Sequence, residues 1–141
     1  MHWTIEGKLT GTISLASCIS FRQYRLVWSV VLPSEVEDWF LSLDSGSSDL
    51  VADAIDHLQE VGPTLGRPLV DRIKGSVHHN MKELRAGSTG SSEIRILFVF
   101  DPERQAVLLV GGDKSGQWKQ WYAENIAVAD ARYTRWLDDG H

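Results

Sequence analysis

Four basic residues lie in or next to three different predicted β segments in the second half of the chain: Lys82, Arg85, Arg95 and Lys114. A protein that cleaves RNA without a metal ion needs cationic groups around one phosphate, because negative charge builds up on the non-bridging oxygens as a 2′-hydroxyl attacks the phosphorus. We therefore expect neighbouring strands to bring these side chains into one groove. Taken singly, each is equally typical of an ordinary solvated strand residue.

Arg95 differs from the other three because it interrupts an apolar strand. It lies within the sequence IRILFVF, where a buried strand would favour an apolar residue. A charge buried there is costly unless it is paired or bound to an anion. Arg95 therefore requires a partner of opposite charge.

Titratable and aromatic side chains accompany these cations along the chain. His78 and His79 offer imidazole groups of the kind that transfer protons, and only one of two adjacent strand residues can enter a given groove. Trp118, Trp121 and Tyr122 lie in the first turns of the last predicted helix, next to the basic strands. Such rings stack on single-stranded RNA bases, and the same spacing is also typical of core packing.

Other kinds of site lack support in the sequence. The adjacent histidines are a poor ligand pair and no cysteine lies near them, so we expect no metal ion and no cofactor. Gly111 and Gly112 precede Lys114 without the glycine spacing of a phosphate loop. Cys18 is the single cysteine, which excludes an intramolecular disulfide and favours a reducing compartment, the cytoplasm. No uncharged run reaches the ~18 to 20 apolar residues of a membrane span.

The elements that must position these residues form an α+β pattern. Ser34 and Glu37 have the spacing of a capping box, which predicts that a helix begins there. Hydrophobic periodicity and turn residues predict a helical hairpin and an antiparallel meander, with the helices on one side of the sheet. The predicted strands are 26–32, 77–85, 93–100 and 105–111, the predicted helices are 34–45, 48–61 and 115–137, and 62–76 is a predicted loop.

Charge is segregated along the chain, although the net charge is −5. Residues 34–61 hold eight acidic residues and no lysine or arginine, whereas residues 66–122 hold nine basic residues against six acidic ones. A basic surface keeps its local field when the acidic residues lie beyond a Debye length of ~8 Å. The acidic hairpin is either a surface for a basic partner segment or an ordinary solvated helix face.

Several segments resemble the RelE/ParE superfamily of toxins, most closely the HigB-like, phage-derived branch of bacterial type II toxin-antitoxin systems. The resemblance rests on residues 27–33, 62–71, 74–76, 79–85 (HNMKELR), 94–98 and 110–114 (VGGDK). It implies a compact microbial RNase fold for residues 27–141. Residues 1–26 lie outside it, as either a flexible N-terminal extension or the product of a start codon placed too far upstream.

The same resemblance implies a function and assigns roles to residues. The function is ribosome-dependent cleavage of mRNA, an endoribonuclease reaction in which the 2′-hydroxyl attacks the phosphorus to give a 2′,3′-cyclic phosphate and a free 5′-hydroxyl. A helix-turn-helix antitoxin would neutralise the toxin, and operator DNA would be bound only through that antitoxin. The implied catalytic residues are Lys82, Arg95, His79 and Tyr122, and the implied RNA-binding residues are Arg85, Lys114 and Trp118. No pair of residues is assigned to proton transfer, for which His78, His79 and Tyr122 are all candidates.

Two other functions are compatible with the resemblance. The ParE side of the superfamily poisons DNA gyrase and needs no RNA-cleaving group of residues. A chain that has lost its activity would keep the fold to bind an antitoxin or regulate an operon. We expect the endoribonuclease, because four cations on successive strands lie next to aromatic residues of the last helix.

Overall fold

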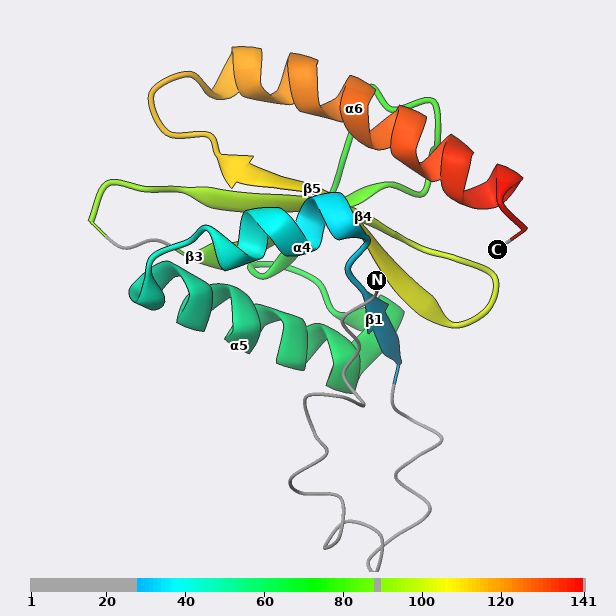
Figure 1. Ribbon diagram of the computed structural model, residues 1–141, viewed down its shortest axis with the longest axis horizontal. Helices are drawn as coiled ribbons and strands as arrows, with labels where there is room; N and C mark the ends of the chain where they lie inside the picture. The colour runs from blue at the N-terminus through cyan, green and yellow to red at the C-terminus, as the bar shows by residue number, and fades with distance from the viewer. Residues whose placement is uncertain (1–27, 88–89, 141) are drawn as a thin grey trace, which may run out of the picture.

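The computed structural model describes residues 28–87 and 90–140, which form a five-stranded sheet with helices (Figure 1). The predicted α+β fold, with a helical hairpin before the sheet and a helix after it, is confirmed, as expected for a compact RelE-like fold. The elements in chain order are β1 (Ser29–Val31), α4 (Ser34–Leu41), α5 (Ser45–Val61), the 3-10 turn η2 (Gly62–Thr64), β2 (Val70–Arg72), β3 (Lys82–Gly87), β4 (Ile94–Phe100), β5 (Gln105–Asp113) and α6 (Trp118–Asp138). The prediction for residues 1–26 lies outside the described residues.

The sheet has the strand order β1-β5-β4-β3-β2. The predicted meander is confirmed, because β3, β4 and β5 pair antiparallel in sequence. β1 adds to β5 in parallel, so the sheet is mixed rather than wholly antiparallel. β2 pairs with β3 at the other edge, within a segment predicted to be a loop, and its three residues are too few for a periodic signal.

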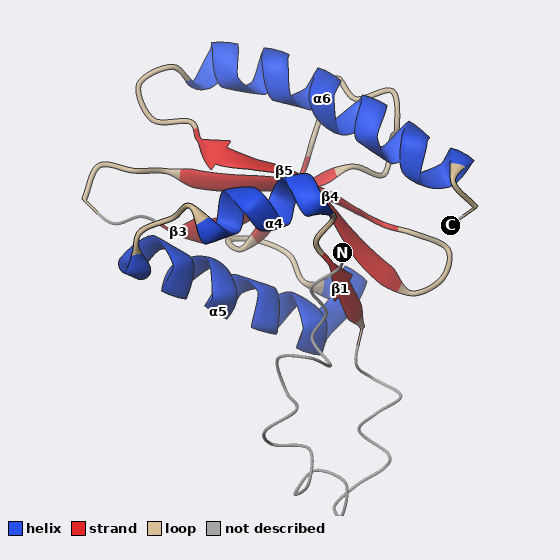
Figure 2. Cartoon of the chain, viewed as in Figure 1, coloured by secondary structure: helices blue, strands red, loops and turns tan. Residues whose placement is uncertain are grey.

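Helices cover both faces of the sheet, and the prediction of helices on one side is wrong. Ile96 and Phe98 of β4 pack in a cluster with residues of α4 and α5. Leu97 and Val99 pack on the opposite face against α6. The sheet lies between α5 and α6 (Figure 2). Because this strand is apolar on both faces, each face needs a cover.

α4 begins at Ser34 as predicted, whereas α5 begins at Ser45, three residues before its predicted start. The capping box is not formed: Pro33 precedes α4 and its carbonyl accepts from the amides of Val36 and Glu37, each at 2.9 Å, with no side-chain cap. α5 begins at Ser45 because the Asp44 carboxylate accepts from the Ser47 amide at 3.2 Å.

Residues 76–78, before β3, contact α6 and do not extend the strand. The Asp130 carboxylate accepts from the Ser76 hydroxyl and from the Val77 amide, the latter at 3.1 Å. The His78 ring lies edge-on to Tyr133, with 4.8 Å between centroids. These contacts explain why β3 begins at Lys82 and not at residue 77.

Candidate active site

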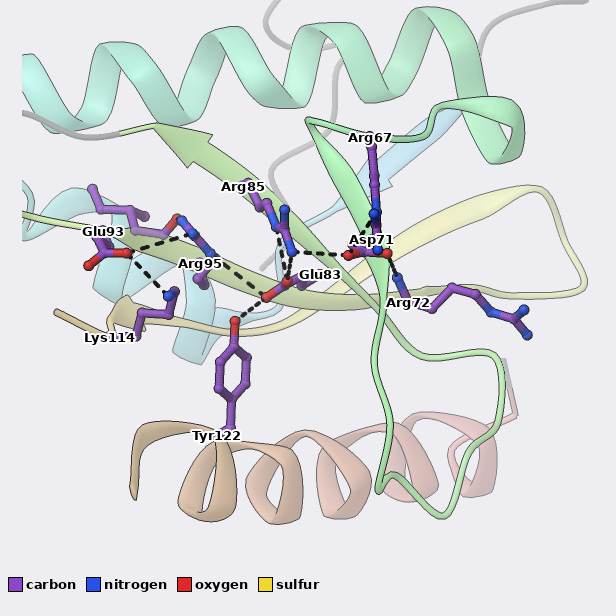
Figure 3. Close-up of polar contacts among 10 residues, drawn as sticks. Arg67, Asp71, Arg72, Glu83, Arg85, Glu93, Arg95, Lys114 and Tyr122 are labelled. Carbon is purple, nitrogen blue, oxygen red and sulfur yellow. Dashed lines mark hydrogen bonds and ion pairs between the residues drawn. The ribbon is translucent and has the colours of Figure 1, made fainter. Parts of the chain in front are cut away.

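Polar side chains gather on the α6 face of the sheet, next to the first turns of that helix (Figure 3). β3 supplies Glu83 and Arg85, β4 supplies Arg95, and α6 supplies Tyr122. Lys114 follows directly after β5. Strand alternation places residues 83, 85 and 95 on one face, because Arg85 and Arg95 are direct cross-strand partners. The structure therefore brings together three of the four predicted cations.

A carboxylate that the sequence analysis did not single out, Glu83, lies at the centre of this group. Its side chain is 4% exposed. The Tyr122 hydroxyl donates to Glu83 Oε1 at 2.5 Å, and Arg85 Nε donates to Oε2 at 3.0 Å. A carboxylate buried to this degree must be paired. No separate signal in the sequence marked its burial, because Lys82 and Arg85 on the same strand are charged as well and only half-buried.

Arg95 lies beside Glu83 with unused hydrogen-bonding capacity. Its side chain is 15% exposed, and Nη1 donates to the Ile94 carbonyl at 3.0 Å. Nε lies 3.8 Å from Glu83 Oε1, too far for a hydrogen bond, and has no acceptor within the described part of the chain. The expectation that Arg95 needs a partner of opposite charge is confirmed, and its guanidinium is able to accept a further anion.

Glu93 provides a second carboxylate at the edge of the group. It lies 3.2 Å from Lys114 Nζ and 3.9 Å from Arg95 Nη2. The Lys114 amide also donates to the Glu93 carbonyl at 3.0 Å, which fixes the start of the loop before α6. The cations of the site are therefore held in place by carboxylates, and a bound phosphate would compete with these carboxylates.

Tyr122 is protonated at neutral pH. Burial is the main cause that raises the pKa of Tyr122 to about 12, and the hydrogen bond to Glu83 is the second cause. The hydroxyl is thus a proton donor and not a base. Lys114 Nζ lies 5.9 Å from the centroid of the same ring, so the phenol contacts both a cation and a carboxylate.

A groove opens beside the two arginines. Its volume is about 350 Å³, and its lining residues are Pro68, Leu69, Arg85, Gly87, Glu93 and Arg95. An anion in this groove would meet two guanidinium groups from adjacent strands. The arrangement is able to bind a phosphate, to accept a proton at Glu83 and to donate one from Tyr122.

The prediction that Lys82 and Arg95 share a groove is wrong. Lys82 alternates with Glu83 on β3 and points to the α5 face, where Nζ lies 3.4 Å from the Pro63 carbonyl oxygen. The ammonium is also 5.5 Å from the centroid of Phe100, a ring of the α5-side core. Side chains that alternate along a strand cannot meet without a bulge, so Lys82 is not part of this site.

His79 also lies apart from the cationic group. Its neighbour His78 is 3.1 Å from the Thr134 hydroxyl. Thr134 lies twelve residues after Tyr122 on α6, which is about 18 Å along the helix at 1.5 Å per residue. His79 itself is exposed. Residues 76–78 are hydrogen-bonded to Asp130 and Thr134 in the C-terminal half of α6. Both histidines therefore lie away from the site.

The aromatic residues of α6 divide between surface and core. Trp118 is 54% exposed, so its core-packing alternative is wrong, and its ring is 6.5 Å from that of Tyr122. Trp121 packs against the core on the α6 side. An ideal Cβ on Gly112 would lie 2.6 Å from Trp121 Nε1, and one on Gly111 would lie 2.4 Å from Trp39. The glycine pair thus allows tryptophans to press on β5 from both faces.

The described ranges hold neither a metal-binding cluster nor a membrane-spanning helix. Residues 28–87 and 90–140 contain no group of three His, Cys, Asp or Glu side chains placed to hold a metal ion. No helix in the same ranges is long and apolar enough to cross a membrane.

Comparison with known proteins identifies the family. A family model described as "Phage derived protein Gp49-like (DUF891)" matches residues 38–134. A Mycobacterium tuberculosis protein named "Putative toxin HigB3" is 53% identical over 113 residues, which cover 80% of this chain and 96% of the relative. A second protein of that organism, named "Putative toxin HigB2", is 50% identical over 123 residues, which cover 85% of this chain and 61% of the relative. No solved structure matches this chain significantly. The chain therefore belongs to the Gp49-like family of phage-derived proteins and, within it, to the HigB-like toxins.

Proposed function

We propose that this chain is the toxin of a type II toxin-antitoxin system and that it cleaves mRNA at the Glu83–Arg95 site. One observation carries the proposal: a buried carboxylate hydrogen-bonded to a protonated phenol, Tyr122, with two arginines within 4 Å of it. Proton acceptor, proton donor and anion-binding groups are the components that metal-free phosphodiester cleavage requires.

The scissile phosphate binds in the groove between Arg85 and Arg95. Arg85 is about one third exposed and covers Glu83, so it is the group able to turn outward toward an incoming phosphate. Its shift frees one carboxylate oxygen of Glu83 to face the ribose 2′-hydroxyl. Arg95 Nε makes no hydrogen bond to Glu83, so its guanidinium is available to bind the non-bridging oxygens of the phosphate, where negative charge develops.

The reaction moves one proton through the carboxylate and the phenol. Glu83 takes the 2′-hydroxyl proton as the 2′ oxygen forms its bond to phosphorus. The bond from phosphorus to the 5′ oxygen breaks, and Tyr122 protonates that oxygen. Tyr122 recovers a proton from Glu83 across their hydrogen bond, so both side chains return to their starting state. The products are a 2′,3′-cyclic phosphate and a 5′-hydroxyl.

Trp118, Lys114 and the partners of the protein complete the proposal. The exposed ring of Trp118 stacks on a base next to the cleaved bond, and Lys114 holds a neighbouring phosphate. The substrate is mRNA on the translating ribosome, which places the reaction in the cytoplasm. A helix-turn-helix antitoxin is the neutralising partner, and operator DNA is reached through it.

Mapping RNA ends in growing bacteria tests this function. Induction of the wild-type chain should produce new 5′ ends within translated codons and stop protein synthesis. Arg85→Gln combined with Arg95→Gln should abolish these ends, because the phosphate then loses both guanidinium groups. Glu103→Gln, at an exposed turn residue, is the control and should leave cleavage unchanged.

Two outcomes would contradict the proposal. Unchanged cleavage by the double variant would remove the site from the reaction. Intact mRNA together with inhibited DNA supercoiling would show that the chain acts as a gyrase poison instead.

A further inference from the structure

Like charges face each other across the β2–β3 ladder on both of its faces. Asp71 is the direct cross-strand partner of Glu83, and Arg72 is the direct partner of Lys82. Like charges in direct opposition on neighbouring strands destabilise a sheet. Each pair therefore needs a group of opposite sign between or beside its members.

The acidic pair has such a group within the protein. Arg85 Nη2 lies 3.0 Å from Asp71 Oδ2 and 3.0 Å from Glu83 Oε2, so one guanidinium joins both carboxylates (Figure 3). Glu83 belongs to the site described above, and Asp71 lies on the same face of the sheet. Arg67 Nε also lies 3.2 Å from Asp71 Oδ2, and Arg95 Nε lies 3.8 Å from Glu83 Oε1, so both carboxylates are paired within the protein.

The cationic pair has no such group. No described carboxylate lies within ion-pair distance of the Lys82 ammonium, whose neighbours are the Pro63 carbonyl and the Phe100 ring. The Arg72 side chain forms no ion pair with another described residue either, and it extends away from the residues around Glu83 (Figure 3). Two opposed cations without a carboxylate favour the binding of an external anion.

The two cations line a groove that is separate from the candidate active site. Its volume is about 270 Å³, and its walls are residues 63–67, Val70, Asp71, Arg72 and Lys82. Arg67 adds a third cation at its rim, with Nε 3.2 Å from Asp71 Oδ2. Asp71 contributes the groove's single carboxylate, which is shared between Arg67 and Arg85. The groove therefore keeps an excess of positive charge.

We propose that Arg72 and Lys82 bind a second phosphate of the RNA that is cleaved at Glu83. The inference rests on the proposed function. Arg85 lines the first groove and Lys82 lines the second, and these residues are three apart on β3, about 10 Å at ~3.3 Å per residue. Their side chains point to opposite faces of the sheet, next to its edge strand β2. An RNA strand can thus pass around this edge from one groove to the other.

The salt dependence of RNA binding tests the second phosphate site. The probe is a single-stranded 2′-O-methyl RNA, which cannot be cleaved because its 2′ oxygen is blocked. For the wild-type chain, the logarithm of the binding constant should fall linearly with the logarithm of salt concentration. Arg72→Gln combined with Lys82→Gln should weaken binding to every sequence and reduce the slope by about 1, as expected for one lost phosphate contact.

Lys74→Gln is the matched control, because Lys74 is an exposed cation two residues from Arg72 that does not line the groove. It should leave the slope unchanged. The double variant should melt at or above the wild-type temperature in low salt, because it lacks the opposed charges.

Each adverse outcome has a distinct meaning. An unchanged slope in the double variant, with RNA still bound and cleaved by the wild-type chain, overturns the second site alone. Failure of the wild-type chain to bind RNA overturns both this site and the proposed function. Competition by a poly-glutamate peptide as strong as that by RNA of equal charge overturns RNA as the occupant.

Discussion

At the scale of single residues, the chemistry of this protein depends on how Glu83 is held. A carboxylate with a 4% exposed side chain is kept in place by one phenol and one arginine, with a second arginine at 3.8 Å. Arg95 could be recognised from the sequence as a charge in an apolar strand. Glu83 could not be recognised in the same way, because its burial depends on α6, which begins 35 residues later in the chain.

Replacement of Tyr122 by Phe should destabilise the protein at neutral pH. It should also make the free energy of unfolding fall less steeply as pH rises above 10. The raised pKa of Tyr122, about 12, means that the unfolded state loses this proton at a lower pH than the folded state. The stability contributed by Tyr122 is therefore present below pH 10 and is lost as pH rises through 12. Urea denaturation of both proteins from pH 8 to pH 11.5 measures the difference. An identical decline in Tyr122→Phe would contradict the assignment.

At the scale of elements, the glycine pair in β5 controls how closely α4 and α6 approach the sheet. Trp121 presses on Gly112 and precedes Tyr122 directly, so the helix position decides whether the phenol reaches Glu83. The sequence pattern excluded a phosphate loop at this glycine pair and suggested no other role for it. The sequence did not predict this packing role, because it depends on Trp39 and Trp121, which lie on different helices and are far apart from each other in the sequence.

Gly112→Ala should therefore cost both stability and activity. The new methyl group forces the indole of Trp121 to move, which in an overpacked core costs about 1 to 3 kcal/mol of unfolding free energy. The same movement draws Tyr122 away from Glu83 and lowers the cleavage rate. Gly66→Ala is the control, because nothing lies within 4 Å of its Cβ position. Equal stability of the two variants in urea would refute the steric role.

A surface ion pair joins α4 and α6. Arg135 Nη2 lies 2.5 Å from Glu35 Oε2, and this hydrogen bond lowers the pKa of Glu35. The stabilisation is therefore present above the unfolded-state pKa of the carboxyl and is lost as pH falls through the lowered value. Because both side chains are partly exposed, Glu35→Gln should cost no more than about 1 kcal/mol, and less in high salt. A loss of unfolding free energy well above this value, measured by urea denaturation, would contradict the assignment of this contact as a surface ion pair.

At the scale of the whole molecule, acidic residues lie on α5, whereas basic residues lie on and next to β3 and β4. Asp49, Asp53 and Glu60 lie exposed along α5, as the sequence predicted for the acidic hairpin. Periodicity predicted the order and type of most elements. It did not predict the second helical layer or the edge strand β2, because both are decided by contacts between distant segments. The same limit explains the errors at Lys82 and His79, whose directions depend on where β3 begins.

The acidic face of α5 should accelerate binding of an antitoxin with a basic segment. Asp49→Lys combined with Asp53→Lys and Glu60→Lys should slow association at low salt by at least about tenfold, while dissociation changes little. Stopped-flow measurements at two salt concentrations separate the two rates. Association that is equally fast for the variant would show that the acidic residues form only a solvated helix face.

The most direct test of the central claim is the cleavage rate of Glu83→Gln on translating ribosomes, with the chemistry of the RNA ends determined. The amide cannot accept the 2′-hydroxyl proton, so the rate should fall by about 10²- to 10⁴-fold, while Glu103→Gln cleaves like the wild-type chain. The wild-type products should carry a 2′,3′-cyclic phosphate and a 5′-hydroxyl. A Glu83→Gln variant that folds and cleaves at the wild-type rate would contradict the account, as would products with a 5′-phosphate.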